Sequence, residues 1–194
     1  MKPNKILRTI ECHLGLKPIK MPKIKEDPKY LEGMGSGAVI IDETGITISV
    51  KDKKDLEVIA EELTHIADIR SGTPIEPLEY VSCFYDNVLI EALGYYGSKL
   101  ITPERKPIQI REPELKKDIE EKNWGKLIGF YTTQPGLQKN IRLWHQIGYD
   151  LGEKVYNYVK ATGNKEPAIS LLIKNRNKEK PFEVYKKILE EVTR

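Results

Sequence analysis

Strand-like alternation of side chains is confined to residues 18–50 of this chain, and every later segment with regular apolar spacing has the period of a helix. Residues 18–25 alternate apolar and basic side chains, and Pro22 marks them as an edge strand. Two further apolar runs, 38–41 and 46–50, flank a turn-forming segment and predict a β-hairpin. So few strand residues can build only a small sheet.

Helical spacing predicts one helix before the strands and a series of helices after them. The first covers residues 4–14 and ends at Gly15. Asp52 is the predicted N-cap of the helix that follows the hairpin, with Asp55 in its first turn. The later helices are predicted at 52–70, 87–100, 112–122, 141–159, 167–174 and 181–192, with a loop-rich stretch at 123–136.

This order of elements predicts an α+β fold with a small N-terminal sheet and a helical C-terminal half. A length of 194 residues suits one ordinary domain. We therefore expect a single domain over residues 1–194. Its first part, 1–72, holds the first helix, the sheet and the helix after the hairpin, and its second part, 73–194, is mainly helical.

The composition disfavours several classes of protein. The 32 basic and 29 acidic side chains leave a net charge of +3, whereas dedicated nucleic-acid binders carry a larger, clustered basic excess. No apolar run approaches the roughly 18–20 residues that cross a bilayer, and no signal-peptide core follows the basic N-terminus. Cys12 and Cys83 can form one disulfide at most. We expect a cytoplasmic protein of thermophilic character, with membrane and nucleic acid disfavoured as partners and the oligomeric state left open.

The helix predicted after the hairpin carries the residues that point to chemistry. At about 100° per residue, its apolar side chains fall about 140° to 260° from Glu61 and form a core face: Leu56, Ile59, Ala60, Leu63, Ile66 and Ala67. Glu61, His65 and Glu62 project at about 0°, 40° and 100°. Val58 and Ile69 lie among them, although apolar residues are out of place on a fully solvated face. The polar trio is therefore expected in a partly covered cleft.

Three interpretations compete for this trio. In the first, Glu61 and His65 bind one cation side by side and Glu62 handles protons, as in zinc peptidases whose two ligands at i and i+4 flank a glutamate base. In the second, Glu62 and His65 form the Glu-x-x-His pair of a di-iron bundle. In the third, the histidine is merely hydrogen-bonded to a carboxylate.

The di-iron interpretation is the weakest of the three. Such bundles need a second Glu-x-x-His pair. The residues three positions before the other histidines, His13 and His145, are Ile10 and Arg142. Neither is a glutamate, so the pair that this bundle needs is missing.

The sequence around the trio resembles a known family. Residues 59–65, Ile-Ala-Glu-Glu-Leu-Thr-His, resemble the His-Glu-Leu-Thr-His segment of the gluzincin (peptidase-MA-like) zinc metallopeptidases, with Glu61 in place of the first histidine. The elements before it, Leu14-Gly15 and the small residues 35–38 that lead into a strand, also resemble that group. Residues 89–96, Leu-Ile-Glu-Ala-Leu-Gly-Tyr-Tyr, are similar to the family's second helix.

The resemblance implies a zincin-like fold with zinc as its cofactor and a peptide or protein as its substrate. It implies Glu61, His65 and Glu91 as metal ligands and Glu62 as the base of peptide-bond hydrolysis. The exchange at Glu61 gives the site one imidazole and two carboxylates, a set that shifts preference toward harder metals such as manganese or iron. It also leaves open a catalytically inactive zincin-like scaffold or binding protein without metal, so whether the chain is an enzyme stays open.

Three further residues belong to the candidate site. Residues 147–159 resemble the late helix that backs the site in this family, and a tyrosine or histidine from that region, here Tyr149 or His145, can stabilise the transition-state oxyanion. Their alternative is an aromatic packing face. Asp68, three residues after His65, can orient the imidazole ring, and its alternative is an exposed acid at the helix end.

Overall fold

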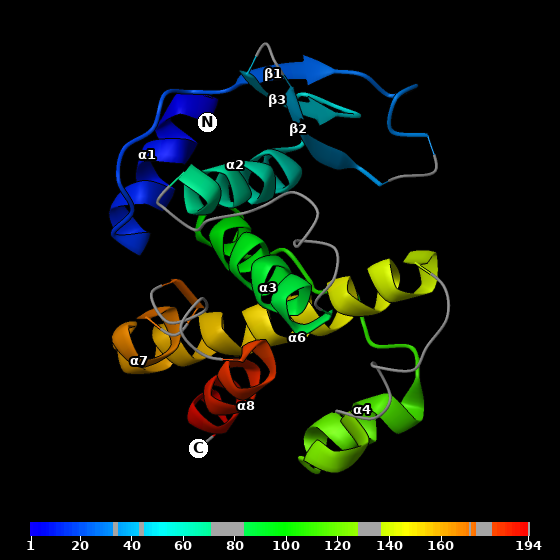
Figure 1. The fold of residues 1–194 in the computed structure, drawn as a ribbon. Coiled ribbons are helices and arrows are strands. Elements are labelled where there is room, and N and C mark those ends of the chain that lie inside the picture. The colour runs from blue at the N-terminus through cyan, green and yellow to red at the C-terminus, as the bar shows by residue number, and fades with distance from the viewer. Residues whose placement is uncertain are drawn as a thin grey trace. The chain divides into compact units, whose positions relative to one another are not determined.

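A computed structural model of the chain describes residues 1–32, 35–42, 45–70, 84–127, 137–170, 172–173 and 180–193. These residues belong to two compact units. Unit 1 comprises Met1–Pro74 and Gly94–Arg105, and unit 2 comprises Ile75–Leu93 and Lys106–Arg194. One helix, α3 (Phe84–Ile101), runs without a break from unit 2 into unit 1 (Figure 1).

Unit 1 contains the small sheet and the helices around it (Figure 1). Its other elements are α1 (Pro3–Leu14), β1 (Lys23–Glu26), β2 (Gly37–Asp42), β3 (Gly45–Val50) and α2 (Leu56–Arg70). The strand order is β1-β3-β2, with β1 parallel to β3 and β2 antiparallel to β3. The predicted hairpin is therefore confirmed, and β1 is an edge strand as predicted, although it begins only at Lys23, after Pro22.

The core of unit 1 lies between α1, α2 and the sheet. Helix α2 contacts α1, β2 and β3. The predicted core face of α2 is buried, with Leu63 and Ile66 fully covered, and only Leu56 at the start of the helix stays half-buried. The other main core side chains are Ile6, Leu7, Ile10, Leu31, Ile48 and Val50. Each buried aliphatic side chain of this size contributes about 1.5–3 kcal/mol to folding.

Helix α2 begins three residues later than its predicted N-cap implies. Asp55, rather than Asp52, caps it: the Asp55 Oδ1 accepts a hydrogen bond from the Val58 N–H at 3.1 Å. Asp52 instead closes the preceding turn, where its Oδ1 accepts from the Lys54 N–H at 2.7 Å. The N-cap prediction was wrong because both aspartates can bond a nearby backbone N–H, and the sequence does not rank them.

Unit 2 is helical in its described part. It contains the first half of α3, α4 (Pro113–Glu120), a helical turn at 124–127, α6 (Leu137–Thr162), α7 (Glu166–Ser170) and α8 (Pro181–Val192). Helix α8 contacts both α6 and α7. The main buried side chains are Leu115, Ile119, Leu143, Ile147, Leu151, Val155, Tyr185, Ile188 and Leu189.

The predicted helices of this unit are confirmed, most of them with shifted ends. Helix α8 has the predicted bounds, whereas α3 starts three residues earlier and α6 is longer at both ends than predicted. The predicted loop at 123–136 contains the helical turn, and 128–136 lie outside the described residues, as do 171 and 174–179 near the end of the predicted helix 167–174.

The mixed α+β class is confirmed, with one small three-stranded sheet near the N-terminus and helices after it. The zincin-like fold and the single domain over 1–194 stay predictions. Among the described residues, no helix combines the length and the apolar character that a membrane span requires.

Candidate metal centre

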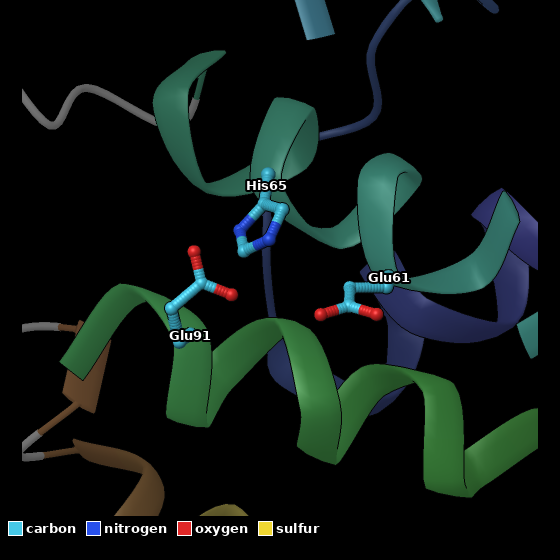
Figure 2. Close-up of side chains that lie close together, drawn as sticks. All are labelled: Glu61, His65 and Glu91. Carbon is cyan, nitrogen blue, oxygen red and sulfur yellow. The ribbon is translucent and has the colours of Figure 1, made fainter. Parts of the chain in front are cut away.

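Three side chains predicted to bind metal lie together. Glu61 and His65 are one turn apart on α2, and Glu91 belongs to α3. One ligand atom from each residue lies within 4.8 Å of the other two. Figure 2 shows the two α2 side chains reaching toward α3, from which Glu91 points toward them. Glu61 is buried and His65 and Glu62 are half-buried, so the partial cover predicted for this trio is confirmed; Glu91 on α3 is also half-buried.

Two glycines of α3 explain why this helix lies so close to α2. A Cβ at Gly94 would meet the His65 ring at 2.4 Å from Cε1 and 2.7 Å from Nε2. A Cβ at Gly97 would lie 2.0 Å from the Thr64 Oγ1. Glu91 lies one turn before Gly94 on the same unbroken helix, and residues three apart share a face. Close packing at the glycines therefore puts Glu91 beside His65.

The donor set suits a divalent cation. Ligand atoms around a tetrahedral ion bound at about 2.0–2.2 Å lie about 3.3–3.6 Å apart. The ligand atoms of the cluster lie within 4.8 Å of one another, so they need to approach by at most about 1.5 Å to hold such an ion. One imidazole and two carboxylates can hold zinc or a harder divalent metal, and three protein ligands leave a position for water or substrate.

Arg105 is the residue of this site that sequence reasoning missed. Its Nη2 donates a hydrogen bond to the Glu61 Oε2 at 2.7 Å. The side chains of the pair are 10% and 7% exposed. Arg105 follows α3 in a turn, 44 residues after Glu61, so neither helical periodicity nor the family motif points to it. A buried guanidinium stabilises the buried carboxylate by a charge-assisted hydrogen bond.

Glu62, the predicted base, lies on the side of α2 that faces β2. A Cβ at Gly37 would meet the Glu62 Oε1 at 2.7 Å and the Val58 Cγ1 at 2.4 Å, so only a glycine allows the strand to pass this close. Glu62 is half-buried there. It is not part of the three-residue cluster, and its role as a base stays a prediction.

Two of the predicted accessory residues lie near Glu91 in unit 2. The His145 Nε2 is 3.5 Å from the Glu91 Oε2. Its ring meets the Tyr149 ring edge to face, with centroids 5.8 Å apart. Glycine again sets the spacing, because a Cβ at Gly148 would lie 2.5 Å from the Glu91 Cβ. Tyr149 is buried, so it also contributes to aromatic packing.

Asp68, the third accessory residue, is buried with only 2% of its surface exposed. The alternative of an exposed acid at the helix end is therefore wrong. It lies three residues after His65, on a neighbouring position of the same face. Orientation of the imidazole by Asp68 stays a prediction.

The family resemblance and the cluster involve the same two short segments. Residues 59–65 supply Glu61 and His65, and residues 89–96 supply Glu91. These segments cover a small part of the chain. No family model matches the chain, and no curated protein or solved structure matches it significantly.

Proposed function

We propose that this protein binds one divalent metal ion, zinc or a harder ion, through Glu61, His65 and Glu91, and hydrolyses peptide bonds with Glu62 as general base. One observation carries the proposal: the ligand atoms of the three residues, from two different helices, lie within 4.8 Å of one another. Helical spacing alone would explain the proximity of Glu61 and His65, but not the arrival of Glu91.

The roles proposed for the side chains come from the family resemblance and from the chemistry of each group. A bound ion supplies Lewis-acid chemistry, which polarises a carbonyl group and makes water more acidic. Glu62, next to the ligands on α2 but turned toward β2, accepts a proton from the attacking water and passes it to the leaving amine. His145, 3.5 Å from Glu91, is a donor for the developing oxyanion.

A second candidate function is a non-catalytic scaffold that binds a partner without metal. The ion pair between Arg105 and Glu61 favours it, because this pair already satisfies the buried carboxylate. If the chain binds no metal, the buried carboxylate of Glu61 needs a positively charged partner, and Arg105 supplies it.

Metal analysis separates the two functions. The purified full chain, its His65→Ala and Glu91→Gln variants and the control Glu120→Gln are loaded with zinc or manganese, dialysed and analysed for metal. Glu120 is an exposed residue of α4 and leaves the cluster intact. We expect one metal per chain in the wild type and the control, and less than a tenth of that in the two cluster variants. No retained metal in any protein would favour the scaffold.

A peptidase assay tests the role of Glu62. With a fluorogenic peptide library as substrate, Glu62→Gln is expected to lower hydrolysis by 100-fold or more while retaining its metal, because general-base catalysis contributes about 10²–10⁴-fold. Equal hydrolysis by the wild type and Glu62→Gln would remove Glu62 from the mechanism.

A further inference from the structure

The side chain of Arg105 is held on every side by residues of unit 1. Its Nη1 donates to the Ser98 Oγ at 2.5 Å, and its Nη2 donates to the Glu61 Oε2 at 2.7 Å. The guanidinium lies over the Tyr95 ring, 4.9 Å from the centroid, and its Nε is 3.7 Å from the Glu57 Oε2. Only 10% of the side chain is exposed, so the charge is fixed in place.

The backbone at Arg105 is fixed as well. Its carbonyl oxygen accepts hydrogen bonds from the Lys99 Nζ at 2.8 Å and from the Tyr95 hydroxyl at 3.1 Å. Its N–H donates to the Thr102 carbonyl at 3.0 Å. The turn after α3 therefore presents the guanidinium to Glu61 in one orientation, which is what a positioned counter-charge requires.

This arrangement changes the charge that the cluster offers to a cation. Glu61 and Glu91 together carry two negative charges, which would neutralise a divalent ion. Arg105 adds one positive charge next to Glu61, because its Nη2 donates a hydrogen bond to the Glu61 Oε2. Two charges a few Å apart at a partly buried site interact strongly enough to change a binding constant by orders of magnitude.

We propose that Arg105 is the counter-charge of the metal site: it cancels the carboxylate of Glu61, lowers the affinity of the cluster for divalent cations, and leaves a bound ion less neutralised. The inference rests on the proposed metal site. In this role Arg105 is a positioning residue that acts through Glu61. The guanidinium and the carboxylate together carry no net charge, as a neutral ligand would. A less neutralised ion is the stronger Lewis acid.

Zinc titration of the metal-free full chain tests the proposal by isothermal calorimetry. Arg105→Gln retains a donor for Glu61 but removes the charge, and we expect it to bind zinc at least tenfold more tightly than the wild type. Arg105→Lys retains the charge and should stay within about threefold. Arg8→Gln is the matched control, because Arg8 also pairs with a buried glutamate, Glu11, on α1. Its zinc affinity should equal that of the wild type.

The outcomes distinguish the role of Arg105 from the existence of the metal site. Measurable zinc binding that is equal or weaker in Arg105→Gln would overturn the role of Arg105 and leave the metal site standing. Absence of zinc binding in all four proteins would overturn the metal site and this inference with it. If Arg105→Gln does not fold, Glu57→Gln supplies the second test. Glu57 is 43% exposed, and its loss leaves Arg105 less neutralised, so zinc should bind two- to threefold more weakly; unchanged binding would overturn the proposal.

Discussion

The Arg105 Nη2 donates a hydrogen bond to the Glu61 Oε2 at 2.7 Å, and both side chains are at least nine-tenths covered. Removing one partner of such a pair leaves the other charge buried without compensation. The pair therefore ties the stability of unit 1 to the same carboxylate that is proposed to bind metal.

Glu61→Ala is expected to lower the free energy of unfolding of the metal-free protein by about 3 kcal/mol, because it leaves the buried charge of Arg105 without its partner. Urea unfolding in the presence of EDTA measures this change. Glu57→Ala is the control, since its carboxylate is 43% exposed and 3.7 Å from Arg105, and we expect less than about 0.5 kcal/mol. A similar small loss in Glu61→Ala would mean that the pair contributes little.

The pH response of unit 2 should report on Tyr85. Burial raises the pKa of Tyr85 well above its ordinary value of 10.0, and its hydroxyl donates to the Leu127 carbonyl at 2.9 Å. The folded state keeps the phenol neutral while the unfolded state ionises near pH 10. Its contribution to stability is therefore complete below that pH and is lost as the pH rises toward the folded-state pKa.

Absorbance at the tyrosinate band, recorded up to about pH 11.5, checks the Tyr85 prediction. In the folded wild type, Tyr85 is expected to remain neutral at a pH at which it ionises in guanidinium. Tyr85→Phe should reduce the difference between the folded and the unfolded protein by one tyrosine. Ionisation of Tyr85 at its ordinary pH in the folded protein would show that the hydroxyl is accessible to water.

Much of the fold could be predicted from the sequence because it follows local rules. The hairpin of β2 and β3 was predicted from two apolar runs around turn residues, and α8 from its periodicity after Pro181. The burial of Leu63 and Ile66 also followed from their angular position on α2. Helix ends were less certain, because the choice between Asp52 and Asp55 as N-cap depends on a turn that no periodicity encodes.

The candidate site was predictable only in part, because some of its residues are brought together by spacing on one helix and others by tertiary packing. Glu61 and His65 share a helix face, so spacing alone brought them together. Glu91 was predicted from the family resemblance, and its proximity depends on tertiary packing at Gly94. Two helical glycines three residues apart, Gly94 and Gly97, were a readable signal of close helix packing. Arg105 had no such signal, since a residue in a turn after a helix can point in many directions.

His145 offers a way to separate a metal ligand from a neighbouring donor. The His145 Nε2 is 3.5 Å from the Glu91 Oε2, and His145 is not part of the three-residue cluster. We therefore expect His145→Ala to leave zinc affinity within about threefold of the wild type while lowering peptide hydrolysis at least tenfold. His13→Ala is the control, because the His13 Nε2 bonds the Tyr96 hydroxyl at 2.8 Å instead. Loss of zinc binding in His145→Ala would make it a ligand.

The last prediction concerns Gly94, whose missing side chain makes room for the imidazole. A Cβ there would lie 2.4 Å from the His65 Cε1, closer than real contacts allow, so Gly94→Ala must push the ring away from its place beside Glu91. We expect zinc affinity to fall at least tenfold by calorimetry, even though alanine favours a helix over glycine by about 1 kcal/mol.

Gly125→Ala is the matched control for Gly94→Ala, because a Cβ at Gly125 meets nothing within 4 Å. Gly125 lies in the helical turn at 124–127, where alanine gains the same intrinsic preference without a clash. Its zinc affinity should match that of the wild type. If Gly94→Ala also binds zinc like the wild type, His65 has an alternative position from which it can serve the ion, and the close packing of α2 on α3 is not what orients the ligand.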